Sequence, residues 1–237
     1  LDANTTGTNN TAVGFSALGA NITGCPNTAM AYQALLSNTT GTNNTALGYQ
    51  GLRQNTTASD NVAVGHQALC ANTTGSESDA LGSCALKANT TGCRNVAVGK
   101  GAMLLNTEGE CNVAVGHTAL SAQTTGDFNT ALGVKALNAS TTASDNTAVG
   151  FQSLYLNTTG CRNQAMGMYA GYRITTGTNN TLFGYNAGSQ ITTGDANVVI
   201  GDSSGADASM INLTTEDNRA VFGHNGITNA YVKVAFT

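Results

Sequence analysis

Charged and aromatic side chains are scarce in this chain of 237 residues: 9% of the residues are charged, 5% are aromatic, and tryptophan is absent. A core of bulky, interdigitating side chains is therefore not expected. Apolar residues make up 41% of the chain, and alanine supplies a large share of them. Backbones that approach one another closely must then exclude water, which suits a thin molecule better than a round one.

Basic runs and long apolar runs are also missing. The formal net charge is -4, so the release of counterions that drives nucleic-acid binding has no source, and we expect no nucleic-acid partner. No run approaches the ~18 uninterrupted apolar residues of a membrane span, and residues 1–14 lack the basic and apolar regions of a signal peptide. We expect a soluble segment without membrane insertion, with any targeting signal outside it.

A 17-residue repeat fills most of the chain. The unit reads Asn-Thr-Thr-Gly-x-x-Asn-Thr/Val-Ala-Val/Leu-Gly-aromatic/x-x-Ala-Leu-x-x, and twelve copies run from Asn4 to Asp207 without an insertion or deletion. Because loops tolerate changes in length, the constant spacing gives every position a structural role. Positions 1 to 17 are counted below from the starts of the copies, which are residues 4, 21, 38, 55, 72, 89, 106, 123, 140, 157, 174 and 191.

Positions 8 to 12 predict a short strand. Position 10 is apolar in all twelve copies, and position 11 is glycine in eleven. Since side chains alternate along a strand, positions 8, 10 and 12 share one face and positions 9 and 11 share the other. We predict that position 10 points inward and that the small Ala/Gly face is open for contacts. The position-10 residues chosen to represent this row are Val13, Val64, Val98 and Val115, and the glycines are Gly14, Gly48 and Gly99.

Position 7 predicts a corner of the coil, because it is asparagine in eleven copies. Stacked asparagine side chains can pass hydrogen bonds from coil to coil, and asparagine tolerates the left-handed backbone of a sharp turn. The representatives are Asn10, Asn44, Asn61, Asn95 and Asn112. Positions 14 and 15, usually Ala-Leu, fit either a second short strand or one helical turn. The position-15 leucines should meet the position-10 row inside each coil.

These patterns predict a mainly all-β solenoid, or β-roll, of twelve coils over residues 1–207, followed by a separate C-terminal β cap over residues 208–237 with a strand at Tyr231 to Phe236. One strand spacing of about 4.8 Å per coil gives a rod of roughly 58 Å. Each coil buries little apolar surface in return for the ordering of a whole repeat unit. We therefore expect a parallel homotrimer that meets through the Ala/Gly face.

The strand motif resembles a known repeat. Asn-Thr-Ala-Val-Gly at 10–14 and Asn-Val-Ala-Val-Gly at 61–65 resemble the head repeats of trimeric adhesins, which form a left-handed β-roll. The longer unit with Asn-Thr-Thr-Gly turns is similar to phage tail-fibre and virion-appendage proteins. The segments 217–225 and 228–237 are similar to the region before an endosialidase-type, self-cleaving intramolecular chaperone domain.

This resemblance implies a structural fibre or adhesin shaft, most of all a trimeric phage tail fibre for host attachment. Its partners would be its own copies and a host cell-surface receptor, for which a glycan is one candidate. Its location would be the virion or a cell surface, and Thr237 would lie at or just before a processing point. A bacterial surface adhesin head is the alternative within the same resemblance. An ice-binding solenoid is an alternative of another class, because threonine recurs at positions 2 and 3 in eleven of twelve units each.

Residues with catalytic or metal-binding chemistry fall on repeat positions instead of forming a site. Gly201-Asp202-Ser203-Ser204-Gly205 matches the nucleophile-elbow pattern, but both glycines recur in other units. His66 and His117 share position 12 three coils apart, about 14 Å, which is too far for one metal ion. We expect no catalytic residue, no cofactor and no metal, and therefore no enzyme.

Three further features stay open. Cys93 and Cys111 lie in adjacent coils within disulfide range, although we favour free thiols for all six cysteines. Glycosylation sequons such as those at Asn4 and Asn138 arise as a by-product of an Asn- and Thr-rich repeat. Aromatic residues at position 12, such as Phe15, could stack on sugars if exposed, but we favour packing in the core or between coils.

Overall fold

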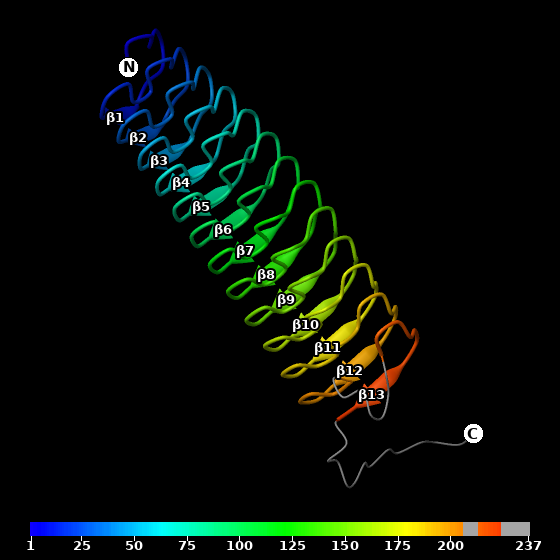
Figure 1. Ribbon diagram of the computed structural model, residues 1–237. Coiled ribbons are helices and arrows are strands. Elements are labelled where there is room, and N and C mark those ends of the chain that lie inside the picture. Colours follow the sequence, from blue (N-terminus) through cyan, green and yellow to red (C-terminus); the bar gives the residue numbers. More distant parts are fainter. Residues whose placement is uncertain (206–212, 224–237) are drawn as a thin grey trace, which may run out of the picture.

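The computed structural model describes residues 1–205 and 213–223, which form a straight rod of stacked coils (Figure 1). The fold is an all-β parallel β-solenoid, as the repeat predicts. One three-residue strand from each coil contributes to a single sheet along the rod. The strands are β1 Thr11–Val13, β2 Thr28–Met30, β3 Thr45–Leu47, β4 Val62–Val64, β5 Asp79–Leu81, β6 Val96–Val98, β7 Val113–Val115, β8 Thr130–Leu132, β9 Thr147–Val149, β10 Gln164–Met166, β11 Thr181–Phe183, β12 Val198–Ile200 and β13 Ala220–Phe222.

The sheet follows the repeat register. Its thirteen strands pair in chain order, all parallel, and Thr11 faces Thr28 at the start of the ladder. From β1 to β12 every partner lies one repeat length further along the chain. Each strand therefore covers positions 8 to 10 of its unit. The remaining positions are turns, and the described part of the chain contains no helix.

Positions 13 to 15 form a turn, which settles the choice left open between strand and helix. Ser16 at position 13 and Leu18 at position 15 have φ values of 55° and 50°. Left-handed backbone costs an L-residue about 1–2 kcal/mol, so neighbouring coils must hold it in place. The amide of Leu18 donates to the carbonyl of Ala34 in the next coil at 3.0 Å, and the Leu18 side chain is fully buried.

The core is made of the alanines at positions 9 and 14 and the leucine at position 15, such as Ala29, Ala34 and Leu35, all fully buried. The prediction that position 10 points inward is wrong. Val13 is 56% exposed, Val115 is 37% exposed, and Val64 and Val98 are half-buried. The alternation along the strand was assigned correctly, but the faces were exchanged. The position-15 leucine leaves room for only a methyl group on the inner side of the strand.

The glycines at position 11 do not form an open face either. Gly14, Gly48 and Gly99 have φ values of 124°, 137° and 129°, which strain any side chain. A Cβ atom on Gly99 would lie 2.6 Å from the carbonyl oxygen of Gly116 in the next coil. The Ala/Gly face predicted for trimer contacts is therefore taken up inside the solenoid, and valine at Gly99 would damage the coil itself.

In the last coils the large core side chains stand at different positions of the repeat. Gly171 and Gly188 replace the position-15 leucine, with φ values of 60° and 59°. Leu182 replaces an alanine at position 9, and Ile174 and Ile191 replace asparagine at position 1; all three are buried. A Cβ atom on Gly171 would lie 2.6 Å from Cδ1 of Leu182, so the larger side chain fills the space that leucine leaves at position 15.

The sheet continues beyond the boundary expected at residue 207. Strand β13 pairs with β12 so that Val198 faces Ala220, and the coil between them is longer than the preceding ones. Leu213 is buried in this additional coil. The described part of the expected cap, residues 213–223, thus belongs to the same stack. The strand expected at 231–236 lies outside the described residues.

The exchange of faces predicts opposite tolerances at two neighbouring residues. Ala97→Thr places a β-branched, polar side chain in the core and should lower the free energy of unfolding by about 1–3 kcal/mol. Val98→Thr is a nearly isosteric change on the outer face and should change it by no more than about 0.5 kcal/mol. Thermal melting followed by circular dichroism compares the two. Equal losses would contradict this assignment of faces.

Candidate functional site

A buried asparagine ladder runs along the corner at position 7. The amide of Asn44 donates to Oδ1 of Asn27 in the preceding coil at 2.9 Å, and its Nδ2 donates to the carbonyl of Ala58 in the next coil at 2.8 Å. The same pattern passes through Asn10, Asn61, Asn95 and Asn112. The side-chain donors and acceptors of these asparagines are paired with neighbouring coils. The ladder therefore stabilises the stack and offers no unpaired hydrogen-bonding group to a ligand.

A second ladder, at position 1, was missed by the sequence reasoning, which used these asparagines only to align the units. Nδ2 of Asn38 donates to Oδ1 of Asn21 at 2.9 Å and to the carbonyl of Gly41 at 3.0 Å. The recurrence of asparagine at position 1, at a constant spacing along the chain, was the signal that could have predicted this ladder. The ladder is interrupted where position 1 changes residue type, and the buried Oδ1 atoms of Asn106 and Asn157 have no hydrogen-bond partner at these breaks.

The two threonine rows, at positions 2 and 3, differ in whether their side chains are free to contact a ligand. At position 2 the hydroxyl donates to the main chain of the next coil, as from Thr39 to the carbonyl of Thr56 at 3.1 Å. At position 3 the side chains, such as Thr40 and Thr91, are exposed. Only one of the two adjacent threonine rows therefore has its hydroxyls directed away from the coil's own hydrogen bonds.

The residues with catalytic or metal-binding types are dispersed. Ser204 is buried, and its hydroxyl donates to the carbonyl of Gly223 at 2.8 Å, while the neighbouring Ser203 hydroxyl donates to Asp202 at 3.3 Å. His66 stacks on Tyr49, and His117 lies against its neighbour Thr118. Residues 1–205 and 213–223 contain no group of three or more His, Cys, Asp or Glu side chains placed to hold a metal ion.

All six cysteines are free thiols in the structure. Cys93 and Cys111 are joined through their main chains, since the amide of Cys111 donates to the carbonyl of Cys93 at 3.0 Å. Burial raises the pKa of the Cys70 thiol, and the opposing effects of Arg53 and Lys87 are smaller. The Cys70 thiol is therefore less reactive than an ordinary cysteine.

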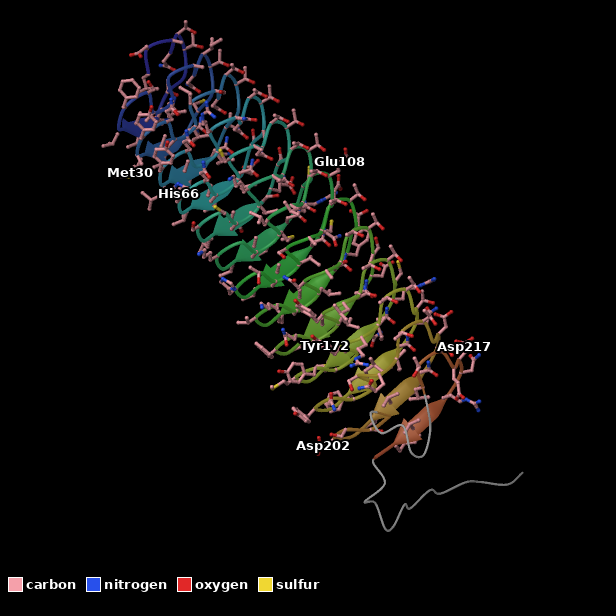
Figure 2. All side chains as sticks on the ribbon, in the orientation of Figure 1. Met30, His66, Glu108, Tyr172, Asp202 and Asp217 are labelled. Carbon is pink, nitrogen blue, oxygen red and sulfur yellow. The ribbon has the colours of Figure 1, made fainter. Side chains whose placement is uncertain are left out.

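The outer face of the sheet is the most distinctive surface. Position 10 places an apolar side chain on it in every coil, and we call this row the aliphatic stripe. Its members are Val13, Met30, Leu47, Val64, Leu81, Val98, Val115, Leu132, Val149, Met166, Phe183, Ile200 and, from the added coil, Phe222. All but three are exposed. Met30, His66 and Asp202, at positions 10 and 12, project from one long side of the rod, and Glu108 and Asp217 project from the opposite side (Figure 2).

An aromatic column lies beside this stripe at position 12. Phe15, Tyr32, Tyr49 and His66 stack in succession, each ring centroid 5.3 Å from the next. The rings thus pack between coils, which is one of the two uses favoured from the sequence. They do not lie in the core, because Phe15, Tyr32 and Tyr49 stay exposed to solvent. A second aromatic group lies near the C-terminal end, where Tyr169 meets Tyr172 and Tyr185 edge-on.

Comparison with known proteins gives no match: no protein-family model, no curated protein and no solved structure matches the chain. Among residues 1–205 and 213–223 there is also no helix of the length and hydrophobicity needed to cross a bilayer. The candidate site is therefore defined by the geometry of the outer face alone.

The asparagine ladder predicts one stabilising and one destabilising substitution. Ser78 interrupts the position-7 row: its hydroxyl accepts from the amide of Asn95 in the next coil, but it lacks the Nδ2 donor that asparagine supplies. Ser78→Asn should add this donor and raise the free energy of unfolding by about 1 kcal/mol. Asn112→Ala should lower it by about 2–4 kcal/mol, because the amide of Asn129 and the carbonyl of Gly126 lose their partner. Chemical denaturation measures both. A neutral Asn112→Ala would show that the ladder contributes little.

Proposed function

We propose that this chain is the shaft of a structural fibre or adhesin, assembled as a parallel homotrimer and used for attachment to a host, with a phage tail fibre as the best-fitting example. The observation that carries the proposal is the aliphatic stripe. A soluble chain rarely leaves a contiguous apolar surface of this length uncovered. The exposed fraction reaches 56% at Val13 near one end and 68% at Phe222 near the other.

A second copy of the same chain is the partner that suits the stripe. The stripe recurs once in every coil over the whole described rod, so only a partner with the same rise per coil can cover all of it. Parallel copies in register meet this condition, since each coil then lies beside its own equivalent. A closed arrangement around a threefold axis lets every chain turn the same face inward. The outer sheet face thus takes the role first given to the Ala/Gly face.

The attachment role draws on the rod shape and on the resemblance to adhesin heads and virion appendages. An extended shaft built from interlocking ladders holds a receptor-binding surface away from the particle that carries it. The virion and a bacterial cell surface are both compatible locations. Immunogold labelling of phage particles, compared with labelling of the host cell envelope, separates the two.

The ice-binding alternative has one observation in its favour, the exposed threonine row at position 3. It has less support than the fibre, because the adjacent hydroxyls at position 2 are used in hydrogen bonds to the main chain. Clear thermal hysteresis of the purified rod would reverse this ranking.

The fibre proposal predicts the mass of the particle and the face that assembles it. Light scattering should give three times the chain mass of 23.9 kDa. The double variant Val98→Asp, Val115→Asp places two charges on the aliphatic stripe and should dissociate the trimer while the circular dichroism spectrum is kept. Thr91→Asp, on an exposed turn in the same unit as Val98, is the matched control and should stay trimeric. A folded wild-type monomer at micromolar concentration would contradict the proposal.

A further inference from the structure

We propose that a hollow between the tenth and eleventh units binds one pyranose ring that carries a carboxylate. The hollow has a volume of about 180 Å³ and is lined by Tyr169, Tyr172, Arg173, Asn186, Ser189 and Gln190. This inference rests on the proposed function, because it names the class of receptor sugar that the shaft would recognise. Tyr172 lies in the C-terminal part of the rod (Figure 2).

The hollow forms where a column of rings ends. Tyr155 and Tyr172 occupy position 16 of successive units and stack with centroids 5.3 Å apart and planes inclined by 10°. One coil further on, position 16 is Ser189, which is too small to cover the other face of Tyr172. Tyr169 stands edge-on to Tyr172, with a centroid distance of 5.7 Å and an angle of 80°. The two rings make a rigid apolar corner on which the C–H face of a sugar can stack.

The polar groups around this corner match sugar hydroxyls. Ser189 is 3% exposed, and its hydroxyl has no hydrogen-bond partner. A buried hydroxyl is seldom left unpaired, and a ligand in the hollow that reached this atom would supply the missing partner. Asn186 and Gln190 are half-buried and supply amide donors and acceptors on the same wall.

The charge of the wall selects an acidic sugar. Arg173 is exposed and takes part in neither of the two ion pairs found among residues 1–205 and 213–223. Among residues 1–205 and 213–223, no acidic residue lines the hollow. A guanidinium group binds a carboxylate through paired hydrogen bonds. The volume lies below the roughly 300 Å³ at which pockets for larger ligands begin, so one ring fits and a longer glycan would extend into solvent.

Calorimetric titration of the whole chain with methyl β-glucuronide and methyl β-glucoside tests the site. The glucuronide should bind about tenfold more tightly than the glucoside, the difference typical of a charge-assisted pair. Arg173→Gln should remove this preference, and Tyr172→Leu should abolish binding of both sugars. Ser189→Ala should weaken both while raising the melting temperature, because it removes an unpaired buried hydroxyl. The matched controls, Arg162→Gln in the same unit and Tyr32→Leu in the other aromatic column, should bind like the wild type.

Several results would overturn the inference: no binding of either sugar at millimolar concentration, equal affinity for the two, or an unchanged preference in Arg173→Gln. Loss of binding in Arg162→Gln to the same degree would also overturn it. Its failure is distinct from that of the proposed function. Rods that are trimeric and attach to host cells without binding either sugar would refute the sugar site alone. A monomeric rod that binds the glucuronide but attaches to no cell would refute the fibre alone.

Discussion

The rod depends on one constraint: each coil must satisfy its main-chain and corner hydrogen bonds on its two neighbours. A strand of three residues provides few such bonds, so the turns must be satisfied in the same way, as when Leu18 donates to Ala34. The ladder through Asn27 and Asn44 closes the corner. An insertion within a coil would shift every bond beyond it, which explains why the step between paired strands stays constant from β1 to β12.

The same constraint sets the distribution of apolar groups. A coil that must return to its start within one repeat unit has a narrow interior, filled by the methyl groups of Ala29 and Ala34 and by Leu35. Larger apolar residues on the strand then have to lie outside. The aliphatic stripe is therefore a direct consequence of a narrow coil, and the surface proposed for assembly arises from the geometry that limits the stability of a single chain.

The sequence was sufficient for the fold, the register and the asparagine hydrogen-bond ladder through Asn10, because these depend on spacing alone. The left-handed backbone expected at this corner lies one residue earlier, as at Asn9 with a φ of 59°. It was insufficient for the direction of the strand. Alternation separates Ala12 from Val13 but does not say which is inside, and a hydrophobicity ranking favours valine. The better signal was size: position 9 is alanine in ten of twelve units, whereas position 10 varies from valine to phenylalanine. Because the interior of the coil has a fixed volume, the position with the constant residue size, position 9, is the one that points inward. The hollow beside Tyr172 depends on side-chain placement between coils and had no comparable signal.

Breaks in the repeat are where the surface departs from uniformity. In a solenoid every regular position produces a row that looks alike at all heights, so such a row cannot mark one place along the rod. A single change within a row does so. The change from Tyr172 to Ser189 at position 16 ends a column of rings and leaves one face of the Tyr172 ring uncovered. In the core of the same coils, Gly171 replaces a leucine, and the larger Leu182 fills the space that this leucine would occupy. The stack thus tolerates a local irregularity on its surface only because a second, compensating change preserves the coil that supports it.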